Sequence, residues 1–273
     1  MVRFIGQLDK SKGPLPVRVA LRLLPIALFL AVWWLVSALH IWEEVFVPRP
    51  GAVWHRFIES VTTHDGNRGL SGYYLWQHLW ASLWRILNGV GWAILVGVPL
   101  GLVLVTVPAV RVIAEPYLNF VRALPPLAYF SLLIIWFGIE NTSKIWLLFL
   151  AAVAPIAIAV SAGASSVRQE RIDAALSLGA SRLQVVLHVV MPSALPELLV
   201  GIRLAIGFAF TTIVAAETAD GIPGIGGLAW STKKFQQTDI AVLCILVIGF
   251  TALLLDHLVK VVDRVLVPWR GKA

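Results

Sequence analysis

Residues 168–196 carry the sequence RQERIDAALSLGASRLQVVLHVVMPSALP, a polar-flanked interruption in the apolar second half of the chain. Apolar residues recur at helical spacing in two short pieces, residues 172–178 and 181–190. We expect these helices to meet at Gly179, because glycine tolerates the backbone of a sharp turn. We expect the second to stop at Pro192, because proline cannot donate a helical hydrogen bond. Such an amphipathic segment is either membrane-surface structure or a docking surface for another protein.

The composition of the chain indicates its environment. Of the 273 residues, 59% are hydrophobic and 14% are charged, and the mean hydropathy is +0.84. A soluble domain has roughly 25% charged and 45–50% apolar residues, so we interpret the chain as an integral membrane protein. The net charge of +7 does not indicate nucleic-acid binding, because the basic residues stand at the ends of apolar segments and not together on one soluble face.

The apolar segments predict an all-α integral membrane fold. Crossing about 30 Å of hydrocarbon takes about 20 helical residues, and a helix satisfies its own backbone hydrogen bonds there. The third predicted span contains Pro125 and Pro126, so we expect an irregular start. We take 1–20 and 267–273 as terminal tails and 21–266 as the transmembrane domain, which includes a loop at 165–194. Six segments qualify as spans, at about residues 21–39, 86–107, 118–137, 145–164, 195–216 and 240–262.

Lysine and arginine in the connections predict the orientation. Most of them belong to the N-terminal tail, the second-to-third connection, the 165–194 loop and the C-terminal tail, whereas fewer, such as Arg49 and Lys144, fall in the alternate connections. We therefore expect both termini and the 165–194 loop in the cytoplasm. Arg85 and Arg203 lie at or inside helix ends and are not assigned to a side.

The connection between the first two spans is aromatic. Trp76, Trp80 and Trp84 recur every four residues, which places them on one face of a helix that leads into the second span. Tryptophan is enriched at membrane–water interfaces, so we interpret this stripe as an interfacial anchor, with ligand binding as the alternative.

Residues 221–227 read GIPGIGG and invite comparison with a phosphate-binding loop. Such a loop needs a preceding strand and a following Lys-Ser/Thr pair, and this run has neither. We expect instead a tight turn, re-entrant or external, with positive φ angles at its glycines. The chain therefore does not bind ATP by that device.

The sequence predicts no catalytic or metal site. The six histidines are scattered without a ligand-spaced pair, and the one cysteine, Cys244, lies in an apolar run. Acidic residues are nearly absent from the predicted spans. We single out Glu217, near the outer end of the fifth, and Asp256, low in the sixth, and expect each to pair with Arg or Lys or to lie at an interface. A proton-relay transporter needs intramembrane carboxylates, so a stand-alone secondary transporter is the weaker alternative, as is a membrane-anchored scaffold. We interpret the chain as a non-enzymatic membrane protein whose partner supplies energy.

The 168–196 stretch resembles a motif of the permease subunits of bacterial ABC importers. That motif has Glu-Ala-Ala, three residues, Gly, nine residues, Ile, one residue and Leu-Pro. The matching positions here hold Asp173-Ala174-Ala175, Gly179, Val189 and Met191-Pro192. The three departures, Asp for Glu, Val for Ile and Met for Leu, are conservative.

Further stretches resemble the nitrate/sulfonate/taurine branch of these permeases. The resemblance covers roughly residues 25–271. The stretches that resemble this branch are residues 122–128, 136–139, 143–145, 177–181, 195–197, 201–203 and 214–217. Those that look most like the taurine permeases are residues 76–79, 238–239 and 267–271.

The resemblance implies a homodimer of this chain in the bacterial inner membrane, two copies of a cytoplasmic ATPase that bind ATP and Mg, and a periplasmic substrate-binding protein. The chain itself would bind no cofactor. It further implies that the 165–194 loop forms coupling helices that dock on the ATPase, with transport by alternating access. The alternative is a connector that lies on the membrane. The expected coupling residues are Asp173, Ala174, Ala175, Leu176, Leu178, Gly179, Arg182 and Pro192.

The implied substrate is taurine or another organosulfonate, with nitrate, other alkanesulfonates and pyrimidine-type compounds as alternatives. Polar side chains in spans usually line a path, so we expect those of the second, third and fifth spans to do so here. Arg122 and Arg203 have the alternative role of topology or pairing charges. The candidate path residues are Asn88, Arg122, Arg203, Thr211, Thr212 and Glu217.

Overall fold

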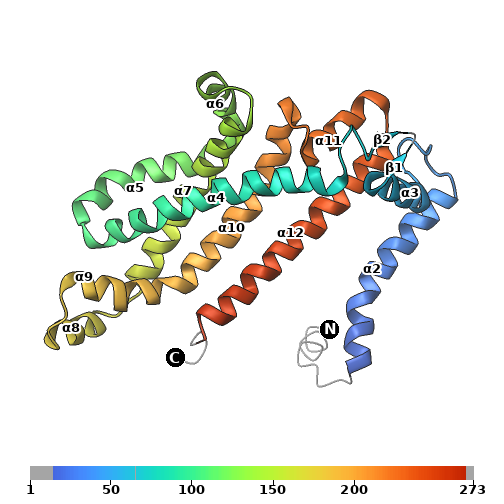
Figure 1. Cartoon of the computed structure of the whole chain (residues 1–273). Helices are drawn as coiled ribbons and strands as arrows, with labels where there is room; N and C mark the ends of the chain where they lie inside the picture. The colour runs from blue at the N-terminus through green and yellow to red at the C-terminus, as the bar shows by residue number, and fades with distance from the viewer. Residues whose placement is uncertain (1–14, 65, 269–273) are drawn as a thin grey trace.

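The computed structural model describes residues 15–64 and 66–268, and most of the two expected tails, 1–20 and 267–273, lies outside them. The described chain is helical apart from its loops and one short hairpin (Figure 1). Its elements are α2 (Leu15–Ala38), α3 (Pro50–Val61), β1 (Thr63–His64), β2 (Asn67–Arg68), α4 (Leu75–Thr106), α5 (Pro108–Ala123), η1 (Pro126–Ala128), α6 (Phe130–Phe137), α7 (Asn141–Ser165), α8 (Gln169–Ser177), α9 (Arg182–Val185), η2 (Val186–Val190), α10 (Met191–Asp220), α11 (Ile225–Ser231), η3 (Thr232–Phe235) and α12 (Thr238–Leu266).

Four helical stretches of the described chain are long and apolar enough to cross a membrane. They correspond to the second, fourth, fifth and sixth predicted spans, and each extends beyond the predicted bounds at one end or both. The stretches are Leu75–Thr106, Asn141–Ser165, Arg182–Asp220 and Thr238–Leu266. α2 has the position of the first predicted span, and its described apolar part covers Leu24–Ala38.

The third predicted span, 118–137, is divided in the structure. α5 ends at Ala123, and α6 begins at Phe130. Leu124 and Pro125 between them have extended backbones, with ψ of 131° and 125°. Each precedes a proline, and proline disfavours the helical conformation of the residue before it. The prolines therefore separate two helices and do more than disturb the start of one.

α4, α7 and α10 form the core of the molecule. A Cβ on Gly97 would lie 3.0 Å from Cγ2 of Ile156, and a Cβ on Gly101 would lie 2.6 Å from the carbonyl oxygen of Ala157. Glycines on α4 therefore set the close approach of α7, as small residues do between membrane helices. The small residues recur at every fourth position of α4, at Gly89, Ala93, Gly97 and Gly101. The buried centre includes Ile86, Val90, Leu148, Ile156, Ala205, Ala209 and Ile213.

The helix that begins with α9 does not stop at Pro192, contrary to the expectation from the sequence. It passes through a π-helical turn, Val186–Val190, into α10, and the proline lies in the first turn of α10. A wider π turn just before the proline accommodates a ring that would clash with the preceding turn of a regular α-helix. The helix consequently continues from Arg182 to Asp220.

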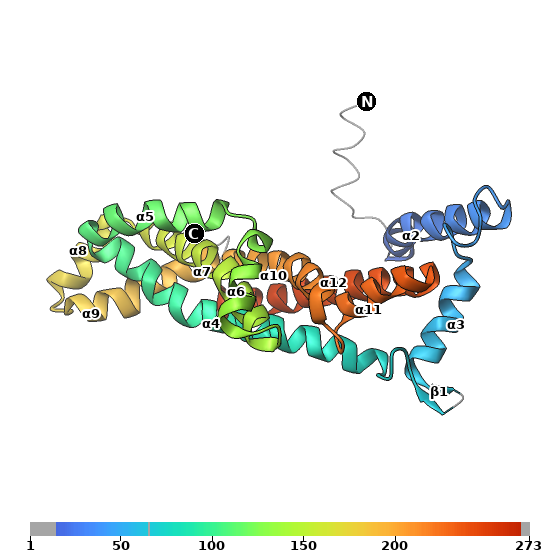
Figure 2. The same ribbon diagram turned by 90° about the horizontal axis from the view of Figure 1, so that it is seen from above.

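The elements are divided between two sides of the molecule. Figure 1 shows α8, α9, the start of α2 and the end of α12 on one side, and α3, the β1–β2 hairpin and α11 on the other. Figure 2 shows α2 and α3 at one end of an elongated molecule, apart from the α4–α7–α10 core.

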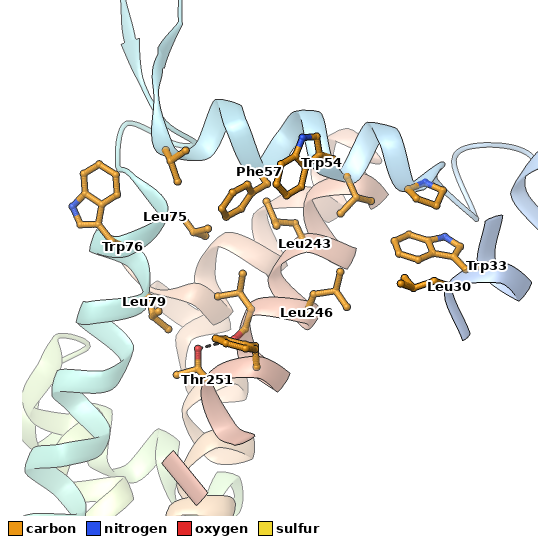
Figure 3. Close-up of a pocket in the computed structure, with 15 residues that line it drawn as sticks. Leu30, Trp33, Trp54, Phe57, Leu75, Trp76, Leu79, Leu243, Leu246 and Thr251 are labelled. Atoms are coloured by element: carbon orange, nitrogen blue, oxygen red, sulfur yellow. Dashed lines mark hydrogen bonds between the residues drawn. The ribbon is translucent and has the colours of Figure 1, made fainter. Parts of the chain in front are cut away.

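An apolar groove of about 580 Å³ lies between α2 and the rest of the chain (Figure 3). Trp33 of α2, Trp54 of α3, Leu79 of α4 and Leu246 of α12 contribute to its walls. Trp33 Nε1 donates a hydrogen bond of 3.0 Å to the carbonyl of Pro48, just before α3. This bond joins α2 to the segment that leads into α3.

Candidate functional site

The loop between α7 and α10 folds into two short helices, which we call the α8–α9 knob (residues 169–190). Gly179 makes the turn between them with φ of +86°, a backbone that is unfavourable for a residue with a Cβ. The predicted turn at Gly179 is therefore confirmed. Ser181 then caps α9: its Oγ accepts from the Gln184 N–H at 3.3 Å, and the Gln184 side chain accepts from the Ser181 N–H at 2.7 Å.

The knob has an inner face that attaches it to the core. Val185 and Val190 are buried there with Ala164 at the end of α7 and Ala194 of α10. Ala175 of α8 packs against this group. These contacts are apolar, and they pack the knob directly against the end of α7 and the start of α10.

The outer face of the knob is apolar and exposed. Leu178 is 90% exposed and Leu183 is 67% exposed, and Leu176 and Leu187 are exposed beside them. Clustered exposed leucines mark a contact with another protein or with a membrane. This face is the candidate coupling surface.

The predicted coupling residues divide between the two faces. Ala175 packs inward and Pro192 is half-buried in α10, so these two support the knob and do not form its outer surface. The helical turn of α8 directs Ala175 to the core. The exposed members of the predicted set are Asp173, Ala174, Leu176, Leu178, Gly179 and Arg182.

A buried polar cluster lies near the other end of α10. Glu217 is 1% exposed and forms an ion pair with Arg85 of α4. Glu217 also accepts from Ser82 Oγ at 2.8 Å, and Arg85 Nε donates to Asn141 Oδ1 at 2.7 Å. Buried charges are tolerated where they are paired and hydrogen-bonded, and this cluster meets both conditions.

The same cluster holds the 221–227 segment, which comprises the link between α10 and α11 and the first residues of α11. Buried backbone that lacks helical hydrogen bonds needs other protein groups as partners. Polar side chains inside the apolar helices α4 and α10 meet that requirement. The bonds run from Arg85 Nη2 to Pro223 O (3.0 Å), from Gly224 N–H to His78 Nδ1 (3.2 Å), from Ile225 N–H to Ser82 Oγ (2.9 Å) and from Gly226 N–H to Glu217 Oε2 (2.8 Å).

Close packing, and not positive φ, requires the glycines of this segment, which corrects the expectation from the sequence. Gly221 has φ of −135° and Gly224 has φ of 173°. A Cβ on Gly224 would lie 2.2 Å from Gly221 O and 2.7 Å from Glu217 Cδ, and a Cβ on Gly226 would lie 2.6 Å from Val214 O. Their missing side chains let the backbone lie directly against the carboxylate.

Lys144, which the sequence assigned to an external connection, is buried in the first turn of α7. It is 1% exposed, and its Nζ donates to the carbonyl of Ile139 at 2.9 Å and to the carbonyl of Asp220. Asp220 is the last residue of α10, where the final carbonyls lack helical donors. Lys144 therefore stabilises the end of the helix that carries Glu217.

The predicted path residues are not brought together in one group. Thr211 is exposed on α10, whereas its neighbour Thr212 is 5% exposed and buried. Arg122 is exposed at the end of α5, and Asn88 is half-buried on α4, where it donates to Trp84 O at 2.8 Å. Thr212 is thus out of reach of a solute in this structure.

Two of the predicted path charges are engaged within the chain. Arg203 Nε lies 3.1 Å from Asp256 Oδ1, and Lys260 Nζ lies 2.5 Å from Asp256 Oδ2. Glu217 is paired with Arg85. The expected pairing of both intramembrane carboxylates with basic residues is confirmed, and the buried Glu217 does not face a path in this structure.

The sequence analysis assigned no role in a site to three cluster residues, His78, Ser82 and Arg85. Their spacing of four and three residues places them on one face of α4, inside a mainly apolar segment. This polar stripe is the feature of the sequence that could have indicated the buried cluster. The predicted tryptophan stripe lies on an exposed face of the same helix, with Trp76 and Trp80 both more than half exposed.

α3 is tied to α12 on the side away from the knob. Arg56 Nε donates to Asp239 Oδ2 at 2.7 Å, and its Nη1 donates to Glu59 Oε2 at 2.7 Å. The hydrogen bond that Arg56 donates to the Asp239 carboxylate is the main cause that raises the pKa of Arg56 above its ordinary value. The hydroxyl of Thr238 donates to the carbonyl of Val45. The start of α12 therefore holds both α3 and the segment before it.

Comparison with known proteins assigns the chain to a family. Residues 89–272, which include the knob and Glu217, match the model for binding-protein-dependent transport system inner membrane components. The chain belongs to this family. It is therefore a transport subunit of the inner membrane.

Two curated relatives extend over nearly the whole chain. The chain is 42% identical to the taurine transport system permease protein TauC of Escherichia coli strain K12, over 96% of this chain and 94% of TauC. It is 33% identical to the putative aliphatic sulfonates transport permease protein SsuC of the same strain, over 93% of this chain and 92% of SsuC. Among solved structures, a chain of the MetNI methionine ABC transporter matches with a TM-score of 0.57 and 21% identity, over 70% of this chain and 95% of that chain. The last likeness concerns the fold alone.

Proposed function

We propose that this chain is the permease of an ATP-driven ABC importer that takes up taurine or a related organosulfonate. The observation that carries the proposal is the 42% identity to TauC over 96% of the chain. The identity to SsuC supports a sulfonate as the chemical class and makes other alkanesulfonates the second candidate. Nitrate and pyrimidine-type substrates have less support.

The proposed permease has six spans and both termini in the cytoplasm. α2 and the divided α5–α6 region would supply the two spans beyond the four long apolar helices. The basic residues of the knob and of the end of α12 support this orientation, because Lys and Arg favour the cytoplasmic side. The placement of the knob on the same side as the start of α2 and the end of α12 (Figure 1) agrees with it.

In this proposal the α8–α9 knob docks on a cytoplasmic ATPase, which binds ATP and Mg while the permease binds no cofactor. Leu176, Leu178 and Leu183 would be buried by the ATPase surface, and their exposure in the free chain supports such a contact. Arg182 and Asp173, exposed beside them, would pair with charges at the rim. The ATPase would close on ATP and displace the knob, and the spans would then open to the other side.

The proposed complex contains two copies of the chain, two ATPases and a periplasmic binding protein. The exposed face of α10, with Leu204 and Phe208 each 57% exposed and Thr211 beside them, is suited to pack near the two-fold axis and to border the path. Of the candidate path residues, Thr211 lies on this face. Asn88 of α4 and Arg122 of α5 are also kept as candidates, because each is at least partly exposed. The binding protein would make most of the choice of substrate.

The test is co-expression with candidate ABC ATPases and periplasmic binding proteins from the same organism, followed by purification through a tag on this chain. The ATPase is expected to co-purify, and its rate of ATP hydrolysis is expected to rise when taurine-loaded binding protein is added. A membrane-inserted chain that retains no ATPase would refute the importer. Stimulation by a nitrate-loaded and not by a taurine-loaded binding protein would refute the substrate class.

A further inference from the structure

One helix joins the α8–α9 knob to the buried polar cluster. The backbone is helical from Arg182 to Asp220, over 39 residues, which at 1.5 Å per residue is roughly 58 Å. The knob lies at the start of this helix, and Glu217 lies in its last turn. In Figure 1 the helix runs from α9 on one side of the molecule towards α11 on the other. A single helix therefore links the knob to Glu217.

At that far end, the cluster holds two separate segments. Glu217 and Ser82 accept hydrogen bonds from the backbone at the start of α11, at 2.8 and 2.9 Å. His78 Nδ1 accepts from the Gly224 N–H at 3.2 Å, and its Nε2 donates to the carbonyl of Leu70 at 3.1 Å, in the loop after the β1–β2 hairpin. The cluster thus connects α4 and α10 both to α11 and to the hairpin loop.

The hairpin loop and α11 line a polar pocket of about 380 Å³. Asn67 and Ser71 belong to the hairpin and its loop, Ser231 belongs to α11, and Gln237 precedes α12. Figure 1 shows these elements on the side of the molecule away from the knob. Polar walls on that side suit contact with a loaded binding protein, on which this family of transporters depends. A movement of α11 would change the shape of this pocket.

We propose that Arg85, Glu217 and Ser82 are positioning residues that transmit movement between this pocket and the knob. The inference rests on the proposed function, because it places an ATPase at the knob and a binding protein at the pocket. A binding protein that displaces α11 shifts Glu217 and Ser82, and α10 carries the shift to the knob. Movement of the knob on ATP binding travels the opposite way. A buried, hydrogen-bonded ion pair suits this role, since it resists separation in a medium of low dielectric.

The test compares ATP hydrolysis by the complete complex in proteoliposomes, with and without substrate-loaded binding protein. Arg85→Met combined with Glu217→Gln removes both charges, so that no buried charge is left unpaired. Ser82→Ala removes hydrogen bonds and no charge. Stimulation by the binding protein is expected to fall roughly tenfold in the double variant and about fivefold in Ser82→Ala, while hydrolysis without the binding protein is unchanged. The control, Arg111→Met with Glu115→Gln, removes an exposed ion pair of α5 and is expected to keep full stimulation.

Undiminished stimulation in the double variant and in Ser82→Ala overturns the inference. A parallel loss of basal and stimulated hydrolysis also overturns it, because that is the signature of a merely structural role. If the double variant does not assemble, Ser82→Ala decides by the same criteria. A wild-type chain that retains no ATPase refutes instead the proposed function, so the two failures are distinguishable.

Discussion

Leu178→Ala gives a direct measure of the outer face of the knob. The side chain is 90% exposed, so its truncation removes almost no packing within the chain. Docking on an ATPase would bury it. Leucine to alanine removes three carbon groups worth about 0.8 kcal/mol each when buried, so we expect a loss of about 2 kcal/mol. At 1.4 kcal/mol per factor of ten, the affinity for the ATPase falls roughly 30-fold.

The assay is binding of the purified ATPase to the permease in nanodiscs, with the thermal midpoint of the permease as a measure of its fold. The matched control is Leu253→Ala on α12, which removes a leucine of similar exposure, 71%, outside the knob. The control is expected to bind normally, and both variants are expected to melt with the wild type. Binding by Leu178→Ala within a factor of two of wild type would refute the assignment of this face as the docking surface.

Three further substitutions test other parts of the structure. Gly179→Asp forces a side chain into a backbone with φ of +86°, at a cost of about 1–3 kcal/mol, and adds a charge to the knob. We expect ATP-driven uptake to be lost. Normal uptake would contradict the docking role of the knob. Arg85→Met leaves a buried carboxylate unpaired and is expected to lower the free energy of unfolding in detergent by about 3–5 kcal/mol. The control, Arg111→Met, breaks an exposed pair and is expected to lower it by about 0–1 kcal/mol. Equal losses in the two variants would contradict the burial of the cluster. Gly101→Ala places a Cβ 2.6 Å from α7 and is expected to lower the free energy of unfolding by about 1–3 kcal/mol. The control, Gly91→Ala, places its Cβ in open space and is expected to raise the free energy of unfolding by up to about 1 kcal/mol. A change of the same sign in both variants would contradict the packing of α4 on α7.

The sequence predicted the features that depend on local pattern. Span length and apolar content located the four long helices, because a membrane helix satisfies its own backbone and needs no partner to be recognised. The turn at Gly179 could also be predicted, because a glycine between two short amphipathic helices can adopt the backbone of a sharp turn without help from distant residues. The same reasoning failed at Pro192, where a π turn upstream relieves the clash that would end a regular helix.

The buried polar cluster depended on contacts that no local pattern specifies. Arg85 and Glu217 are 132 positions apart and meet because α4 and α10 pack together. Positive φ angles were predicted for the glycines of the 221–227 segment, because the sequence does not show that they pack against the carboxylate of Glu217. By contrast, the sequence could have predicted that Thr211 is exposed while Thr212 is buried, since neighbouring helical residues point about 100° apart.

The most direct test of the central claim is uptake of radiolabelled taurine by proteoliposomes that contain the chain, the ATPase that co-purifies with it and the loaded binding protein. The account predicts accumulation that requires ATP and all three components, is reduced by excess unlabelled alkanesulfonate and is abolished by Gly179→Asp. Accumulation by the chain without ATP and the ATPase would contradict the account. So would a complete complex that hydrolyses ATP in response to its binding protein and carries no sulfonate.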